Sequence, residues 1–222
     1  MTDSKIDLSS GARVAIGFAI ALFLAPAAQA ADESTLYLYA SGGGVRTSPG
    51  LVQADFDALV AANGPTDIQS NVNNNDSGFK VQVGWIFAPN FALEAGYVGL
   101  GSSRYTATFT DGTAQASFKA GGIVVDVLGI APLGGDFSLY GRLGFIAATV
   151  VTSFTQSGPA GLSINTSGTD GMVRPNFGFG FAYDLSKSTA LRLEVERFSH
   201  LRSSSAGTND MDMVSFGFLL KL

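Results

Sequence analysis

Eight segments of this chain alternate large hydrophobic residues with small or polar ones. The clearest, residues 79–87, reads Phe-Lys-Val-Gln-Val-Gly-Trp-Ile-Phe, with a large hydrophobe at every odd position. Because successive side chains of a β-strand point to opposite faces, such a segment forms a strand with one apolar face. The other segments are residues 36–44, 91–97, 114–130, 137–145, 177–185, 191–196 and 214–222. The pattern predicts an all-β chain.

The links between these segments alternate in length. Residues 88–90, 131–136 and 184–188 are short links, whereas residues 45–77, 102–113, 155–170 and 201–209 are longer and rich in Gly, Ser, Asn and Thr. Short turns at one end and long loops at the other are typical of antiparallel barrels in outer membranes. Within the first long link, residues 55–62 predict a short amphipathic helix.

The composition indicates which face of each strand meets water. Only 14% of the residues are charged, whereas a soluble domain has about 25%. The charged residues alternate with the large hydrophobes, and each would be costly in hydrocarbon near the membrane midplane. We therefore expect an eight-stranded antiparallel up-and-down transmembrane β-barrel whose apolar faces meet lipid. The last strand, ending at Leu222, is expected to close onto the first, which removes both sheet edges.

Residues 1–30 have the organisation of a cleaved signal peptide. Lys5 and Arg13 precede an apolar stretch, Pro26 breaks it, and residues 28–30 (Ala-Gln-Ala) match the small-x-small pattern of signal peptidase. Cleavage there would leave residues 31–222 as one barrel domain, exported through the inner membrane to the cell outer membrane. The chain has no cysteine and a formal net charge of −5, so we expect neither disulfides nor nucleic-acid binding.

Three parts of the chain are similar to a known family. They are SGFKVQVGWIFAPNFALEAGYVGLG at residues 77–101, DVLGIAPLGGDFSLYGRLGF at residues 126–145, and ALRLEVERF followed by DMDMVSFGF at residues 190–198 and 210–218. They resemble the OmpA-like eight-stranded outer-membrane β-barrel family, and the resemblance covers about residues 37–222. The sequence ends on Leu222 where the family usually has an aromatic residue, and we expect no peptidoglycan-binding domain of the kind that longer relatives carry.

The resemblance implies a non-enzymatic, structural or surface-interaction protein, although one fold can serve many functions. Its expected partners are outer-membrane lipid, lipopolysaccharide and, during insertion, the barrel-assembly machinery. Four external loops are the expected contact surface for any external ligand. We expect the protein to be a monomer.

Eight charged residues form a balanced set of four basic and four acidic side chains that we place inside the barrel: Lys80, Glu94, Asp126, Arg142, Arg192, Glu194, Glu196 and Lys221. We expect this network to plug the interior, because eight strands enclose a space that side chains can fill. The alternative is a narrow pore for small solutes or ions, gated by the same ion pairs. The phase of Lys119 does not match that of Asp126, which predicts a β-bulge at Gly121-Gly122.

His200 is the only histidine and suggests a second alternative, a hydrolase that modifies lipid A at the outer rim. Asp210 or Asp212 would then orient the histidine, and one of residues 203–205 (Ser-Ser-Ser) would be the nucleophile. The His-x-Ser arrangement of lipid A deacylases is not matched, because Arg202 stands two residues after His200. We therefore expect no catalytic residue. We also expect no cofactor or metal, since the oxygen-rich residues 71–76 lack the closing glutamate of a calcium loop.

Overall fold

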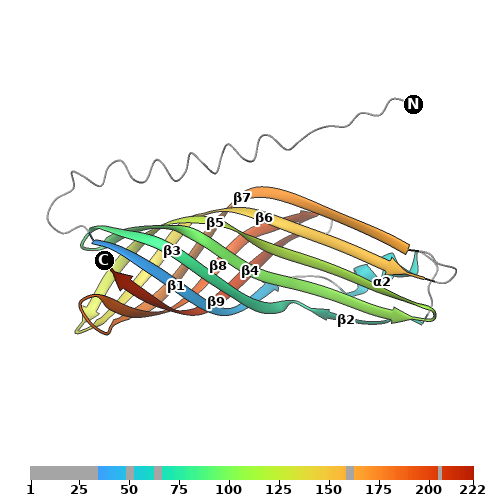
Figure 1. Cartoon of the computed structure of the whole chain (residues 1–222), viewed down its shortest axis with the longest axis horizontal. Helices are drawn as coiled ribbons and strands as arrows, with labels where there is room; N and C mark the ends of the chain where they lie inside the picture. Colours follow the sequence, from blue (N-terminus) through green and yellow to red (C-terminus); the bar gives the residue numbers. More distant parts are fainter. Residues whose placement is uncertain (1–34, 49–52, 63–66, 159–162, 205–206) are drawn as a thin grey trace, which may run out of the picture. The chain divides into compact units, whose positions relative to one another are not determined.

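The computed structural model describes residues 35–222 apart from residues 49–52, 63–66, 159–162 and 205–206. The expected signal peptide, residues 1–30, therefore lies outside the described residues. The described part contains nine strands and one helix (Figure 1). In chain order they are β1 (Thr35–Ser48), α2 (Gln53–Ala61), β2 (Gln69–Asn73), β3 (Asn75–Ala88), β4 (Phe91–Phe109), β5 (Gly112–Gly134), β6 (Phe137–Ser157), β7 (Ser163–Asp184), β8 (Thr189–Ser204) and β9 (Gly207–Lys221).

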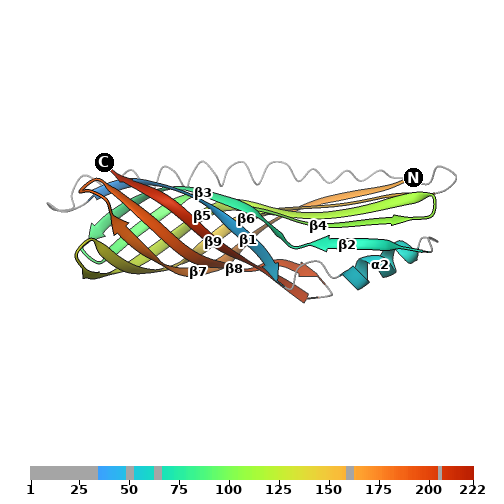
Figure 2. The same cartoon turned by 90° about the horizontal axis from the view of Figure 1, so that it is seen from below.

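Eight of these strands form a closed antiparallel ring (Figures 1 and 2). From β3 to β9 each strand pairs with the next one, and β1 pairs with both β3 and β9. Tyr39 of β1, for example, lies opposite Gln82 on one side and Leu219 on the other. The predicted up-and-down barrel is confirmed. Among the described residues, the additional strand, β2, pairs only with β4.

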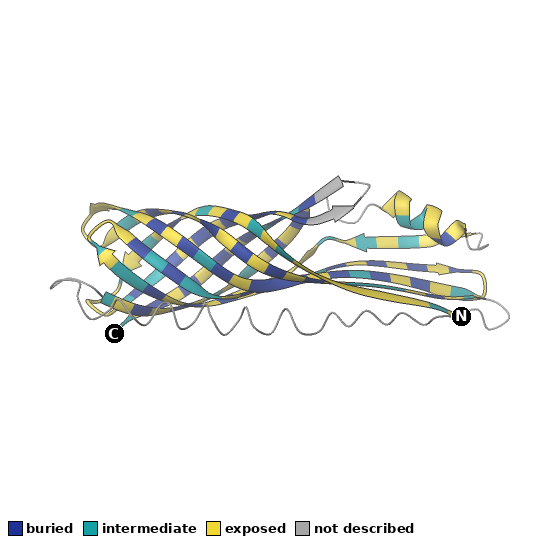
Figure 3. Cartoon of the chain, turned by 90° about the horizontal axis from the view of Figure 1, so that it is seen from above, coloured by how far each residue is buried: buried dark blue, intermediate teal, exposed yellow. Residues whose placement is uncertain are grey.

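Side chains alternate between the outside and the inside of the ring. On β3, Phe79, Val81 and Val83 are each about half exposed, whereas Lys80 and Gln82 are buried. The ring strands therefore show alternating exposed and buried residues along their length (Figure 3). The large hydrophobes point outward, as lipid contact requires, and the charged side chains of the same strands point inward.

Glycines make room for tyrosine rings inside the barrel. A Cβ atom on Gly180 would lie 2.6 Å from the hydroxyl oxygen of Tyr140, and one on Gly217 would lie 2.6 Å from the Cε2 atom of Tyr39. Real side chains do not come this close, so both positions need a residue without a Cβ atom. The rings lie directly across the backbone of neighbouring strands and fill the narrow interior.

Several strands continue well beyond the apolar band, at the end of the long links. Pairing of β4 with β5 extends to Phe109 and Gly112, and pairing of β6 with β7 extends to Ser157 and Ser163. The loops predicted at residues 102–113, 155–170 and 201–209 are therefore mostly strand, and that prediction is wrong. Outside lipid a sheet can carry polar residues on its outward face, so large hydrophobes no longer mark the alternation.

The predicted helix is confirmed as α2, which packs with β2 and β4 in this outer extension. The ring of Phe56 stacks on Tyr105 with centroids 5.1 Å apart, and the Tyr105 hydroxyl donates to Asp57 at 2.7 Å. Val60 is fully buried, and the Gln53 side chain donates to Ser70 at 2.8 Å. Within the described residues no helix is long and apolar enough to cross a membrane.

The β-bulge lies on β4 and not, as predicted, at Gly121-Gly122 of β5. The pairing of β5 with β6 runs through both glycines without a shift, whereas the pairing of β4 with β5 shifts between Gly99 and Ser102. The prediction assumed that the charged Lys119 faces inward with Asp126. Lys119 in fact points outward. A charge is tolerated there because this part of β5 lies in the polar outer extension, where an exposed charge meets no hydrocarbon.

Candidate functional site

The interior of the barrel contains three layers. On β4, the inward-facing Ala92, Glu94 and Val98 belong to the tyrosine-rich, charged and apolar layers in turn. The tyrosine-rich layer contains Tyr37, Tyr39, Ala92, Leu128, Tyr140, Ala190 and Leu219. The apolar layer toward the outer end includes Val98, Leu100, Val124, Ile146, Phe198, Met211 and Met213. The polar plug expected from the charged residues therefore fills only the middle of the interior, and the apolar outer layer is a correction to that expectation.

The structure brings seven of the eight predicted interior charges together in the middle layer: Lys80, Glu94, Asp126, Arg142, Arg192, Glu194 and Glu196, each at most 5% exposed. The eighth, Lys221, lies apart from them. Its side chain is 27% exposed and forms an ion pair with Asp184 at 3.1 Å. Lys221 therefore belongs to the inner end of the barrel and not to the central cluster.

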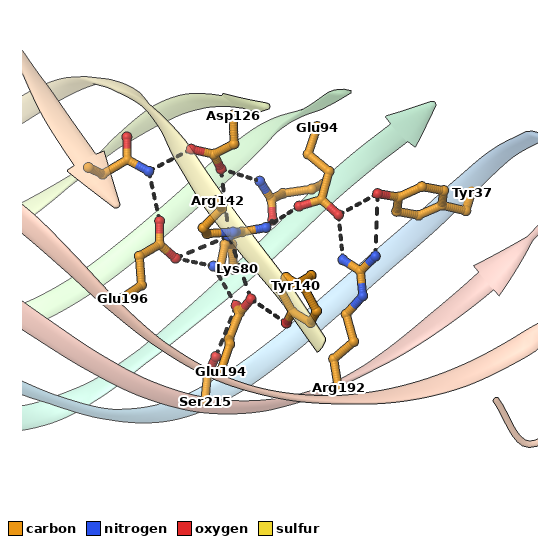
Figure 4. Close-up of polar contacts among 12 residues, drawn as sticks. Tyr37, Lys80, Glu94, Asp126, Tyr140, Arg142, Arg192, Glu194, Glu196 and Ser215 are labelled. Atoms are coloured by element: carbon orange, nitrogen blue, oxygen red, sulfur yellow. Dashed lines mark hydrogen bonds and ion pairs between the residues drawn. The ribbon is translucent and has the colours of Figure 1, made fainter. Parts of the chain in front are cut away.

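Arg142 of β6 lies at the centre of the cluster (Figure 4). Its guanidinium forms ion pairs with Glu94 and, at 3.1 Å, with Glu196. Asp126 and Glu194 are 3.6 Å and 3.7 Å from the same group. One arginine thus contacts all four buried carboxylates, which come from β4, β5 and β8. The planar, five-donor guanidinium suits this arrangement better than an ammonium group would.

Lys80 of β3 lies between two carboxylates of β8. Its ammonium forms an ion pair with Glu194 at 2.5 Å and another with Glu196. Glu194 also accepts hydrogen bonds from the hydroxyls of Tyr140 at 2.9 Å and Ser215 at 3.2 Å. A charge buried in a low-dielectric interior is tolerated only when it has such partners.

Arg192 of β8 joins the charged layer to the tyrosine-rich layer. It forms an ion pair with Glu94, which also accepts a hydrogen bond from the Tyr37 hydroxyl at 2.5 Å. The guanidinium carbon lies 5.2, 5.0 and 4.9 Å from the ring centroids of Tyr37, Tyr39 and Tyr140. Three aromatic faces around one desolvated cation provide cation–π attraction in addition to the ion pair.

Sequence reasoning missed the neutral partners of the cluster: Tyr37, Tyr39, Gln82, Tyr140, Asn176 and Ser215. Asn176, for instance, donates to Asp126 at 2.5 Å and to Glu196 at 2.8 Å. The signal that could have found them is phase, because a polar residue spaced by an even number from an inward charge shares its face. Tyr37 and Tyr39 lay beyond this rule, because residues 36–39 (Leu-Tyr-Leu-Tyr) have a large side chain at every position and therefore fit either phase.

The chemistry of the cluster is that of a polar core in which most groups pair with one another, although the Nε atoms of Arg142 and Arg192 have no hydrogen-bond partner within the described residues. It holds three cations, namely Lys80, Arg142 and Arg192, against four carboxylates, and its side chains are buried on all sides. General acid–base or nucleophilic catalysis needs a reactive group that a substrate can reach. These residues offer ion pairing and hydrogen bonding to one another, which supports a structural role.

His200 has a backbone role in the described structure. Its φ angle of 57° is left-handed, and β8 loses its regular pairing with β9 between Phe198 and Arg202. The backbone N–H of His200 donates to Asp210 at 2.9 Å, and its carbonyl accepts from the Arg174 side chain at 2.9 Å. Asp210 thus contacts the His200 backbone and not the imidazole.

The second acid proposed for a hydrolase is engaged elsewhere. Asp212 is held by Arg197 through hydrogen bonds of 2.6 and 2.8 Å. The serine side chains at residues 203–205 lie outside the described residues. The described geometry therefore provides no acid–histidine pair.

The sequence matches the model of the OmpA-like transmembrane domain over residues 36–221, and no curated protein matches it. Three solved structures are similar. Ail, the attachment invasion locus protein of Yersinia pestis, has 14% identity and a TM-score of 0.45, covering 84% of this chain and 99% of that chain. Neisserial surface protein A has 9% identity and a TM-score of 0.45, with 86% and 100% covered. The N-terminal β-barrel domain of Pseudomonas aeruginosa OprF has 10% identity and a TM-score of 0.44, also with 86% and 100% covered.

Proposed function

The chain belongs to the OmpA-like transmembrane domain family of the cell outer membrane, and on this premise we propose that it is a non-enzymatic barrel with a closed interior. In this proposal the barrel anchors the outer extension, which is the part of β4 to β7 beyond the apolar band, and this extension contacts the cell's surroundings. The observation that carries the proposal is the middle layer, where every buried cation is paired with at least one buried carboxylate.

The two neighbouring layers support a closed interior. The apolar layer lies outward of the cluster, and the tyrosine-rich layer lies inward of it. A hydrated path through the barrel would have to separate buried ion pairs as well as displace these side chains. Breaking a buried pair leaves an uncompensated charge, which is strongly unfavourable. The same contacts that stabilise the barrel therefore oppose ion flow.

Planar-bilayer recording tests this proposal against the alternative of a narrow pore. We expect the purified barrel to show no stable conductance above background, while an open porin recorded in the same bilayers provides the positive control. The fraction of folded protein is checked beforehand by heat-modifiable migration on gels. A large and reproducible conductance of the wild-type barrel would contradict the closed interior and favour the pore.

One strand of the outer extension, β7, supports a role in surface interaction. Between Ser163 and Pro175, β7 pairs with β6, but within the described residues its pairing with β8 begins only at Asn176 opposite Phe198. This leaves one edge of β7 with backbone hydrogen-bonding groups available to an extended segment of another protein. A sheet edge without such a partner is usually blocked by lysine, proline or a bulge.

A binding screen with an edge-blocked variant tests this part. Cells displaying the protein are compared on an array of immobilised proteins and glycans. Thr169→Lys places a charge beside the free part of β7, whereas Thr108→Lys is the matched control, on a strand paired on both sides. We expect at least one immobilised protein or glycan to bind wild-type and Thr108→Lys cells equally well. The same array member should bind Thr169→Lys cells less. Equal binding by cells with and without the protein would contradict the surface role.

A further inference from the structure

A hollow on the outer surface lies where the lipid-facing residues of β3, β4 and β5 give way to polar ones. Gly99 of β4 and Gly121 of β5 are directly opposite each other, so neither strand places a side chain there. Phe79 and Tyr97 line the hollow, with ring centroids 5.9 Å apart, and each is about half exposed. Aromatic rings at the border of an apolar band are typical of the membrane–water interface. The hollow therefore lies at the level of lipid headgroups.

Two basic residues line the part of the hollow farther from the apolar band. Lys119 lies opposite Ser102, and Arg104 lies opposite Ser117. On paired antiparallel strands such diagonal neighbours are about 7–8 Å apart, so one small anion can contact both. Both side chains are exposed. Neither forms an ion pair within the described residues.

The β-bulge of β4 is what turns Arg104 toward the hollow. Before the bulge the even-numbered Val98 and Leu100 face inward, and after it the odd-numbered Ser103 and Tyr105 do so. Gly101, with a φ of 69°, allows this change of phase. A regular strand would have directed residue 104 into the apolar interior layer.

Asp76 holds the bulge in place. One of its carboxylate oxygens accepts hydrogen bonds from the backbone N–H of Ser102 at 2.7 Å and from the Ser102 hydroxyl at 2.9 Å. The other accepts from the N–H of Ser77 at 2.8 Å. The N–H of Ser77, followed by Ser102 and the charge of Arg104, holds the pKa of Asp76 below its ordinary value. With Asp76 ionised, the two basic residues leave the hollow one net positive charge.

We propose that this hollow binds the phosphate group of a phosphorylated glycolipid of the outer leaflet. Arg104 and Lys119 bind the phosphate, and Thr149 at the edge of the hollow can add a hydroxyl donor. Guanidinium groups match the oxygens of phosphate in a bidentate manner. The acyl chains continue from the hollow along Phe79 and Tyr97 into the membrane. This continuous apolar surface favours a membrane lipid over free phosphate, and the inference does not depend on the closed interior.

Native mass spectrometry of the barrel in neutral detergent tests the proposal. The probes are lipid A with both phosphates, the same lipid after removal of its phosphates, and inorganic phosphate as a competitor. The double variant Arg104→Gln/Lys119→Gln removes both charges. Arg46→Gln is the matched control, because Arg46 is equally an exposed basic residue of the outer rim but does not line the hollow.

We expect the wild type and Arg46→Gln to bind phosphorylated lipid A at least about tenfold more tightly than the dephosphorylated lipid, as charge-assisted hydrogen bonds imply. The double variant should lose this preference, and Arg104→Lys/Lys119→Arg should largely retain it. Equal binding of the two lipids to the wild type would overturn the proposal, and so would an equal loss in Arg46→Gln. Full displacement by millimolar inorganic phosphate would assign the site to free anions instead. If the double variant fails to fold, Lys119→Gln alone should weaken binding by a smaller factor, and an unchanged affinity would count against the site.

Discussion

The guanidinium carbon of Arg192 lies 4.9 Å from the ring centroid of Tyr140, while the hydroxyl of the same tyrosine donates to Glu194 at 2.9 Å. One side chain thus contacts a buried cation through its ring and a buried carboxylate through its hydroxyl. Because the two contacts use different parts of the tyrosine, substitution can separate their contributions to stability.

Substitutions of Tyr140 should show two steps of destabilisation. Tyr140→Phe removes only the hydrogen bond to Glu194, which is expected to lower the free energy of unfolding by about 1.5–3 kcal/mol. Tyr140→Leu also removes the aromatic face from Arg192, with a further loss of about 2 kcal/mol for a desolvated cation–π contact. Urea unfolding in lipid vesicles measures both. Equal losses for the two variants would show that the ring contact contributes nothing.

Removal of Arg142 should be more harmful than removal of any exposed charge. Arg142→Ala leaves the carboxylates of Glu94 and Glu196 without their shared partner, and breaking a buried pair costs about 3–5 kcal/mol. The matched control is Arg197→Ala, because Arg197 and Asp212 are 45% and 30% exposed and water can replace their contact. We expect the control to unfold almost like the wild type. Similar unfolding of both variants would contradict the central place of Arg142.

Variants of His200 separate a backbone role from a catalytic one. The left-handed φ of 57° is easy for glycine and strained for a β-branched residue. His200→Gly should therefore preserve stability, whereas His200→Val should lower the free energy of unfolding by about 1–3 kcal/mol. Lipid A from cells expressing either variant or the wild type should have the same mass spectrum. Loss of an acyl chain with the wild type alone would establish a hydrolase.

Export should remove the first thirty residues. The motif at residues 28–30 predicts that the mature chain begins at Ala31 and fractionates with outer membranes. Mass spectrometry of the purified protein gives the N-terminal residue directly, and heat-modifiable migration reports the closed barrel. Intact protein in the cytosol with Met1 retained would refute the prediction.

Local alternation was sufficient to locate the eight ring strands and most of their faces within the membrane, but it missed β2 and the outer extensions of the ring strands. On residues 79–87 the period of two separates Phe79 and Val81 from Lys80 and Gln82, and the structure places the first pair outside and the second inside. This succeeds because a side chain's face depends only on its position along its own strand, and because lipid excludes charge from one face. The same reasoning failed at Lys119, because the outward face of the strand is not in lipid there. At such a position a polar side chain no longer indicates that the residue faces inward.

Only the tertiary structure decided which inward residues meet. Glu94 contacts Arg142, Arg192 and Tyr37, which lie on three other strands. These contacts depend on the register between strands far apart in sequence, and no local pattern contains that register. The bulge at Gly101 shows the same limit, because the sequence marked an irregularity in this region but pairing alone placed it on β4. Alternation is a property of one strand, whereas an ion pair, a bulge or a lipid-binding hollow is a property of several strands held in one alignment.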